Sequence, residues 1–428
     1  MEILLSLSVA ILAGLLMTRV FKPFKLPDVT AYLVAGVLIG PYCLGRLNIP
    51  GFGFTSYESV EKLSLVSNVA LGFIAFSIGN EFRLSALKQT GRQASVIGVF
   101  QAMTAAIAVD IALIAFSLLA PDRLTLSQAI TMGAIATATA PAATLMVVRQ
   151  YKAKGKLTDL LLPIVALDDA VGLVVFAVSF GIAKALITGQ PDMISILVNP
   201  FIEIIASLLL GGVMGYILTK LETLFNSNTN RLNMTTAFVF TTVALSMVEF
   251  HLGPVKVGFS SLLVCMMLGT VFCNLCPLSE DLMTSSSKWT SPLFAAFFVI
   301  SGAELELSVF TDFTIVLLGV IFIVVRSFGK YYGAFLSAKM TKCDEKVCKY
   351  LGITLLPQAG VALGMCVSAK ALGAQGDLIR NITLFAILIY ELVGPLLTKW
   401  ALTKAGDIQP MSEEVKNRRQ TKLEAKMK

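Results

Sequence analysis

The sequence predicts an all-α polytopic membrane protein with 13 transmembrane helices, arranged as six-helix inverted repeats with two crossed broken helices. Of the 428 residues, 56% are hydrophobic and only 14% are charged, against about 25% charged in soluble domains. Apolar stretches long enough to cross a bilayer, at about 20 residues each, recur along the whole length. Prolines interrupt two of these stretches at matching positions, which indicates the broken helices.

The apolar segments follow one another with only short connections. The first begins after Glu2 and has no A-x-A-like cleavage site, so we interpret it as a retained span rather than a signal peptide. The thirteen predicted spans cover about residues 3–19, 29–46, 63–80, 94–119, 127–148, 157–186, 194–219, 233–250, 257–275, 290–308, 313–338, 349–370 and 378–402.

Basic residues concentrate in every second connection. The loops after the first, third, fifth and eleventh spans are rich in lysine and arginine, as is the segment after Ala401. The positive-inside rule therefore places the C-terminus in the cytoplasm and the N-terminus outside. The formal net charge of +7 follows from this topology, so no nucleic-acid partner is needed to explain it. No Walker motif or G-x-G-x-x-G after a strand is found, and neither a nucleotide nor another cofactor is expected.

The spans divide as six, one and six. A single linker span makes the second repeat begin on the opposite side of the membrane, which is the plan of an inverted repeat. The fifth span of each half has a proline beside polar residues: Pro141 follows Thr137 and Thr139, and Pro357 precedes Gln358. Because proline removes a backbone donor, these are candidate helix breaks, and paired breaks indicate a midplane binding site. Two ordinary proline kinks are the alternative.

Asp168 and Asp169 lie in the middle of the sixth span. A charged side chain at bilayer depth costs at least about 2.5 kcal/mol, and two like charges side by side raise the proton affinity of the pair. Proton or cation exchange is the usual reason for such an arrangement. Adjacent helical residues point about 100° apart, so one aspartate can line a cavity while the other faces a neighbouring helix.

Other charges also lie inside predicted spans. The eleventh span carries Arg326 and Lys330, and either is deep enough to reach Asp168. Lysine is the better proton-exchanging partner, because its pKa falls readily on burial whereas arginine stays charged. Asp110 and Glu391 are candidate partners of Arg326, because membrane charges usually pair. A role in helix packing is equally compatible with both.

Four segments resemble the monovalent cation:proton antiporter superfamily. Residues 26–41 (LPDVTAYLVAGVLIGP) and 71–82 (LGFIAFSIGNEF) resemble its early segments. Asp168-Asp169 and residues 329–333 (GKYYG) resemble the paired aspartates and the membrane lysine of its electrogenic sodium/proton branch. Many relatives have an acidic or hydroxyl residue where Ala140 stands here.

The resemblance implies the roles of the site residues. Asp169 would bind the ion and the proton, and Asp168 would form a salt bridge with Lys330. Na+ would be held by Asp169, with Asp168, the Thr139 hydroxyl or backbone carbonyls near Pro141 as further oxygen ligands. Two protons for one cation would make the exchange electrogenic, and the protein would be a homodimer.

We therefore expect a secondary active Na+(Li+)/H+ antiporter and not an enzyme. It would serve pH and salt homeostasis in a prokaryotic plasma membrane, by alternating access with cation and protons competing at the aspartate pair. The alternatives are K+/H+ exchange on the same fold and sodium-coupled symport of an organic anion. An ion channel is disfavoured, because the sequence has no filter-like repeat.

The division of the chain follows from the same plan. The ion-transport helices would move against a scaffold that dimerises and contacts lipid. The predicted boundaries are 1–90 for scaffold and dimerisation helices, 91–190 for the first half of the transport core, 191–310 for the linker span and further scaffold, 311–402 for the second half of the core, and 403–428 for a cytoplasmic tail.

Overall fold

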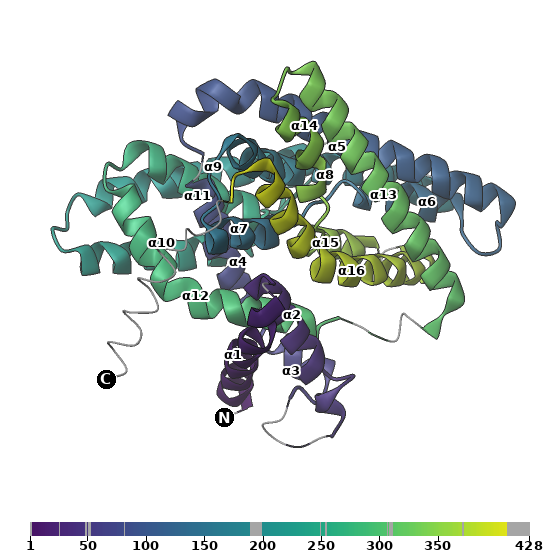
Figure 1. Cartoon of the computed structure of the whole chain (residues 1–428), viewed down its shortest axis with the longest axis horizontal. Helices are drawn as coiled ribbons and strands as arrows, with labels where there is room; N and C mark the ends of the chain where they lie inside the picture. The colour runs from purple at the N-terminus through teal and green to yellow at the C-terminus, as the bar shows by residue number, and fades with distance from the viewer. Residues whose placement is uncertain are drawn as a thin grey trace.

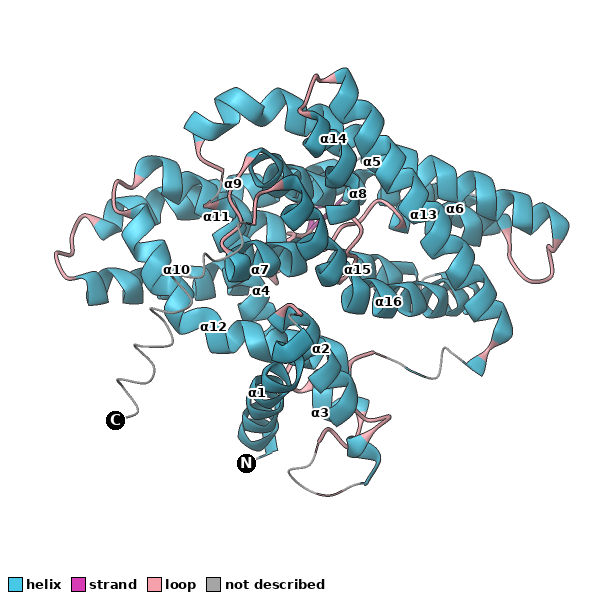
Figure 2. Cartoon of the chain, viewed as in Figure 1, coloured by secondary structure: helices cyan, strands magenta, loops and turns pink. Residues whose placement is uncertain are grey.

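The computed structural model describes residues 2–24, 26–47, 49, 53–80, 82–188, 199–248, 250–252, 255–305, 307, 311–369 and 372–408. Almost all of these residues are helical (Figure 2). Most of the predicted cytoplasmic tail, from residue 409 onward, lies outside the described residues, as does Glu81 of the second matching segment.

Eight α-helices and two short 3-10 helices form the first half of the chain. Their bounds are α1 Glu2–Phe21, η1 Lys22–Phe24, α2 Asp28–Ile39, η2 Leu44–Leu47, α3 Tyr57–Glu61, α4 Ser64–Gly79, α5 Leu84–Leu119, α6 Leu126–Ile135, α7 Pro141–Tyr151 and α8 Lys156–Thr188.

The second half is also helical, with one small hairpin. The strands β1 and β2 pair antiparallel, with His251 opposite Lys256, and they are the one departure from the all-α prediction in the described part of the chain. The bounds are α9 Asn199–Glu222, α10 Asn228–Ser246, β1 Phe250–Leu252, β2 Val255–Val257, α11 Ser261–Leu275, α12 Ser279–Ala303, α13 Phe313–Met340, α14 Glu345–Thr354, α15 Gly360–Ala369 and α16 Ala374–Ala405.

A helix, or a pair of half-helices, lies at every predicted span. Three boundaries differ clearly. Helix α5 begins at Leu84 rather than near residue 94, because its first turns carry the charged residues Lys88 and Arg92. Helix α2 ends at Ile39 rather than near residue 46, because Gly40-Pro41 follows and proline cannot continue a helix. Helix α12 begins at Ser279 rather than near residue 290, because its first turns are polar and were therefore not part of the predicted apolar span. Seven described helices are long and apolar enough to cross a membrane, and the total of thirteen crossings stays a prediction.

The helices gather in two groups (Figure 1). Helix α5 packs against α6, α8 and α13, and α16 packs against α13, α14 and α15. In the other group, α11 packs against α4 and α9, while α12 packs against α1, α2 and α4. The first group lies mainly at the right of Figure 1, and α9 to α12 lie at the left. The division of the chain into a scaffold and a moving transport core stays a prediction.

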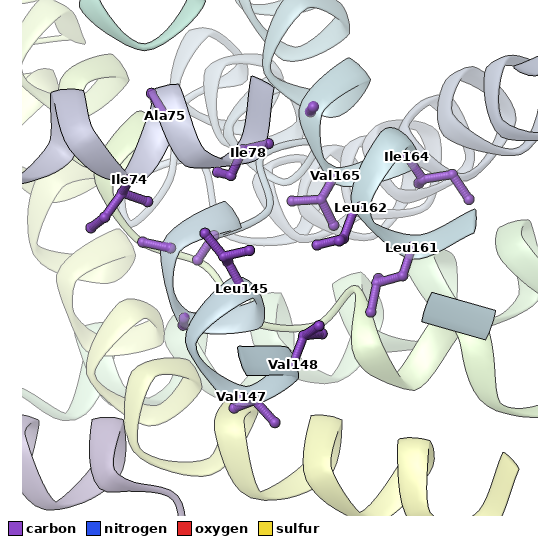
Figure 3. Close-up of a cluster of buried hydrophobic side chains, with 14 of the residues drawn as sticks. Ile74, Ala75, Ile78, Leu145, Val147, Val148, Leu161, Leu162, Ile164 and Val165 are labelled. Carbon is purple, nitrogen blue, oxygen red and sulfur yellow. The ribbon is translucent and has the colours of Figure 1, made fainter. Parts of the chain in front are cut away.

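Apolar side chains fill one boundary between the two groups (Figure 3). Ile74 and Ile78 of α4 belong to the same buried cluster as Leu145 of α7 and Leu161 and Val165 of α8. Helix α2 also contacts α7 and α16, and α8 contacts α9. The helix that carries the two aspartates therefore meets the second group through aliphatic side chains.

The end of α16 caps the start of α8. The Asp407 carboxylate, only 8% exposed, accepts hydrogen bonds from both the backbone N–H and the hydroxyl of Thr158, each at 2.7 Å. The Asp407 carbonyl accepts a further hydrogen bond from the Lys154 backbone N–H at 2.9 Å. A Cβ at Gly155 would lie 2.3 Å from Asp407 Oδ1, so this turn needs glycine. An anionic group here satisfies the free N–H groups at the helix start.

Candidate functional site

Helices α6 and α14 stop in the interior, and short non-helical segments lead on to α7 and α15. Pro141 is the first residue of α7, a position where the missing N–H of proline removes no helical hydrogen bond. The two non-helical segments, residues 136–140 and 355–359, are joined directly, because the Ala140 backbone N–H donates to the Pro357 carbonyl at 2.8 Å. The prediction of two broken helices that meet is confirmed. Below, these segments are called the first and second crossover.

Lys330 and Asp168 form an ion pair beside the first crossover. Lys330 Nζ lies 2.8 Å from Asp168 Oδ2, and both side chains are fully buried. The ammonium also donates to the Thr137 carbonyl at 2.6 Å and to Thr139 Oγ1 at 2.9 Å. The Thr139 hydroxyl in turn donates to Asp168 Oδ2 at 2.5 Å. The site therefore joins α8, α13 and the first crossover through one lysine.

Gln101 of α5 completes the surroundings of Asp168, and the sequence analysis did not select it. Its amide N–H donates to Asp168 Oδ1 and, at 2.9 Å, to the Gly98 carbonyl. The side chain is fully buried. Both oxygens of Asp168 thus accept hydrogen bonds, and the one from Lys330 is charge-assisted. Gln101 is the one glutamine in the predicted apolar span 94–119, and this was the signal available in the sequence.

Asp169 is the opposite case. Its side chain is 1% exposed, and neither carboxylate oxygen has a hydrogen-bond partner within the described part of the chain. A buried ionised carboxylate without donors is strongly unfavourable. Asp169 therefore needs a proton or a cation at its oxygens, whereas Asp168 already has hydrogen-bond donors from Gln101, Thr139 and Lys330.

Arg326 binds backbone carbonyls, and the expectation that Asp110 or Glu391 would pair with it is wrong. Its guanidinium donates to the carbonyls of Ala136 at 3.0 Å, Ala138 at 2.5 Å and Leu356 at 2.8 Å. These carbonyls follow the C-terminal ends of α6 and α14, where backbone acceptors are unpaired and carry partial negative charge. A guanidinium has five donors in one plane, so it can serve both crossovers at once.

The ring of Tyr390 covers the guanidinium of Arg326. The Arg326 Cζ atom lies 4.5 Å from the ring centroid, within the range of a cation–π interaction. The Tyr390 hydroxyl donates to the Ile323 carbonyl at 2.8 Å, one turn earlier on α13. Arg326 is thus fully buried between the two crossovers and an aromatic ring of α16.

Gln358 and Thr137 also serve the crossovers. The Gln358 amide N–H donates to the carbonyl of Ile135, the last residue of α6, at 2.8 Å. Its amide oxygen has no partner among the described residues. The Thr137 hydroxyl donates back to the Ala134 carbonyl at 2.7 Å, so its carbonyl, and not its hydroxyl, faces Lys330. Gln358 therefore connects the second crossover to the first half-helix.

Asp110 and Glu391 do not join the Asp168–Lys330 cluster. Asp110 Oδ1 lies against α6, where a Cβ at Gly133 would come within 1.8 Å of it. Glu391 is 5% exposed and follows Tyr390 on α16. Asp110 Oδ1 and Glu391 Oε2 have no hydrogen-bond partner among the residues that the structure describes. A functional role for either residue stays a prediction.

Two broken helices that meet beside a buried carboxylate–ammonium pair define a membrane transporter of the crossed-helix class. The chain belongs to the sodium/hydrogen exchanger family, because the model of that transmembrane family matches residues 7–404.

Known proteins agree with this assignment. The chain is 22% identical to the high-affinity Na(+)/H(+) antiporter NhaS3 of Synechocystis sp. over 92% of its own length and 88% of that protein. It is 30% identical to cation/H(+) antiporter 19 of Arabidopsis thaliana over 97 residues, which are 23% of this chain and only 12% of that relative. The chain thus matches about an eighth of the length of that plant relative.

The fold is that of a solved antiporter. The sodium proton antiporter MjNhaP1 from Methanocaldococcus jannaschii at pH 8 superimposes with a TM-score of 0.65 at 20% identity, over 95% of this chain and 96% of that one. A second MjNhaP1 structure, from an electron-microscopy map, gives a TM-score of 0.74 at 18% identity, over 94% and 98% of the two chains. At these identities the likeness concerns the fold.

Proposed function

We propose that this protein exchanges Na+ for protons across a membrane, with the exchange taking place at Asp169. One observation carries the proposal: Asp169 is buried, and its carboxylate has no hydrogen-bond partner among the described residues. In the neighbouring Asp168, by contrast, both carboxylate oxygens have partners. A proton and a hard cation are the two species that relieve such a carboxylate. Competition between them for one site is the requirement of an antiporter.

The neighbouring oxygens suit a hard cation. Thr139 Oγ1 and the backbone carbonyls of the first crossover lie within the same cluster as Asp168. Na+ bound at Asp169 would take oxygen ligands from these groups, and Asp168 would turn toward it. Since Thr139 Oγ1 and Asp168 Oδ2 are both engaged by Lys330, cation binding has to weaken the ion pair.

This competition supplies the second proton. Once Asp168 turns toward the cation, the ammonium of Lys330 loses its carboxylate partner in a buried environment, and burial favours the neutral amine. Lys330 then releases a proton along with Asp169. Two protons for one Na+ make the exchange electrogenic, and Li+, as another small hard cation, is a second substrate.

The placement in the membrane belongs to the same proposal. The N-terminus lies outside and the C-terminus in the cytoplasm of a plasma membrane, as the loop charges favour. The group formed by α5–α8 and α13–α16 moves against the remaining helices, which form a homodimer. Apolar side chains on α1, such as Leu4 at 71% and Leu16 at 68% exposed, face lipid or a second copy.

Proton flux in proteoliposomes tests the proposal. The purified protein should acidify or alkalinise the lumen when a Na+ gradient is imposed, and Asp169→Asn should abolish this flux. Glu222→Gln is the matched control and should keep the flux, because it also removes a buried carboxylate but lies at the end of α9, where it accepts a hydrogen bond from Thr235 at 2.9 Å. Full exchange by the Asp169 variant would exclude Asp169 as the exchange site.

K+/H+ exchange is the second candidate. The plant relatives are named only as cation/H(+) antiporters, so their names do not distinguish Na+ from K+. Flux in the same liposomes with Na+, Li+ and K+, at a clamped voltage, decides between the two. A response to K+ alone would replace the proposed substrate, and flux that does not change with voltage would exclude the electrogenic mechanism.

A further inference from the structure

Helices α5, α8 and α13 come together around Gln101, and glycines allow them to pack closely. A Cβ on Gly333 of α13 would lie 2.7 Å from Gln101 Cα, and a Cβ on Gly329 would lie 2.7 Å from Ala105 Cα. Two glycines four residues apart let two membrane helices approach closely. Gly98 of α5 lies close to Leu167 of α8. Helix α5 is therefore held between the helix of the aspartates and the helix of the lysine.

Gln101 is the α5 residue that reaches the ion pair. It holds Asp168 Oδ1, while Lys330 and Thr139 hold Asp168 Oδ2. Without the amide donor, Asp168 would have one free oxygen, as Asp169 has two. The difference between the neighbouring aspartates thus depends on a residue that is neither charged nor on their own helix.

The amide oxygen of Gln101 gives the residue a second use. Oε1 is buried and has no partner among the described residues. An ionised carboxylate only accepts hydrogen bonds, whereas a protonated one also donates. A glutamine amide offers N–H on one side and oxygen on the other, so rotation of the amide would present the acceptor to a protonated Asp168.

We propose that Gln101 is a positioning residue for exchange: its amide holds Asp168 Oδ1, so that the carboxylate stays hydrogen-bonded and directed at Lys330 until a cation at Asp169 draws it away. This inference rests on the proposed function. The charged groups that face this junction are Asp168 and Asp169 from α8 and Lys330 and Arg326 from α13. Helix α6 brings no titratable residue, and on α5 itself Asp110 lies more than two turns away.

Gln101→Leu and Gln101→Glu separate the role of the amide from that of the side-chain volume. In the leucine variant Asp168 loses a donor and protons compete more strongly with Na+. The apparent KM for Na+ should rise about tenfold, the effect of one hydrogen bond to a charged group, and the acid limb of the pH profile should move to higher pH. In the glutamate variant a protonated carboxyl can still donate, but an ionised one repels Asp168. Exchange should therefore persist at the acid end of the profile and be lost at the alkaline end.

Thr104→Val is the matched control on α5. The Thr104 hydroxyl donates to the Phe100 carbonyl at 2.7 Å, within its own helix, and Thr104 also lies beside Gly333, where an added Cβ would be 2.9 Å from Thr104 Cβ. This variant should keep the wild-type KM and pH profile. If Gln101→Leu does not fold, Gln101→Asn against Gln101→Glu carries the test, because only glutamate can lose activity through ionisation.

The outcomes are distinguishable. Opposite pH shifts in the leucine and glutamate variants support the inference. A leucine variant with wild-type KM and pH profile overturns it, as does a glutamate variant whose profile matches that of asparagine. Wild-type protein that does not exchange Na+ for protons overturns the proposed function, and this inference with it.

Discussion

Two successive turns of α13 each carry a buried cation, and the two cations bind different kinds of partner. Lys330 binds a carboxylate and a hydroxyl, beside one carbonyl. Arg326 binds three backbone carbonyls and an aromatic ring. A carboxylate can take up a proton or a metal ion and so release its partner, whereas a backbone carbonyl cannot. The same helix therefore presents one exchangeable contact and one permanent contact.

The choice of residue matches this difference. A lysine can lose its proton when its counter-charge leaves, and an arginine remains charged in any protein environment. Lysine at position 330 and arginine at position 326 are thus each suited to the partner they have. Substitutions at position 326 should therefore affect mainly stability, whereas substitutions at position 330 should affect mainly transport.

Arg326→Met should have the largest effect, on stability. The substitution leaves three buried carbonyls without a donor, and each unsatisfied group costs about 1–3 kcal/mol. We expect a loss of at least about 3 kcal/mol, seen as a strong fall in the melting temperature of purified protein or as failure to recover folded protein. Arg326→Lys, which keeps the charge with fewer donors, should lie between this variant and the wild type. Unchanged thermal stability would show that Arg326 is not what holds the crossovers together.

Lys330→Arg should preserve the ion pair and impair transport. The guanidinium can still bind Asp168, but it does not release a proton. We expect near wild-type stability, exchange slowed more than about tenfold, and loss of the Na+-driven current, since one of the two proton carriers is gone. Currents from proteoliposomes on a solid support measure this. A full current in the arginine variant would contradict the role of Lys330 as the second carrier.

Thr139→Val should have a moderate effect. The hydroxyl donates to Asp168 and accepts from Lys330, and a hydrogen bond to a charged group contributes about 1.5–3 kcal/mol. The apparent KM for Na+ should therefore rise about tenfold. Thr139→Ser, which restores the hydroxyl, should return the KM toward the wild-type value. A serine variant as impaired as the valine variant would point to packing instead.

Lys156→Gln should have the smallest effect. Lys156 Nζ lies 2.7 Å from Asp344 Oδ2, but the two side chains are 76% and 54% exposed. Ion pairs at the surface contribute little, because water and salt screen them. The melting temperature and the exchange rate should both be unchanged. A clear loss of exchange would show that the α7–α8 and α13–α14 turns, which this pair joins, take part in transport.

Much of the fold was predictable because hydropathy and proline act locally. Apolar runs located the helices, and Pro141 and Pro357 located both breaks. The Asp168–Lys330 pair followed from a resemblance, since depth alone admitted Arg326 equally well. Whether Asp169 and Lys330 exchange protons stays a prediction.

The remaining contacts of the site involve groups that cannot be identified from the sequence. The partners of Arg326 are backbone carbonyls that the helix breaks leave unpaired. Every residue has a carbonyl, so a sequence does not show which carbonyls are available. Pairing of side-chain charges therefore predicted Asp110 and Glu391 instead. Gln101 was missed because a single glutamine in an apolar span can have many structural reasons. The fold is needed to show that its amide N–H reaches Asp168 Oδ1.

The cap formed by Asp407 has a practical consequence for anyone who modifies this protein. The helix that holds both aspartates starts against a residue from the far end of the described chain. A reporter domain or purification tag fused directly after Ala405 would remove that residue. Fusions placed after Ile408 leave the Thr158 contacts in place. A series of truncations that end between residues 405 and 408 should show which is the last residue needed for the stability of α8.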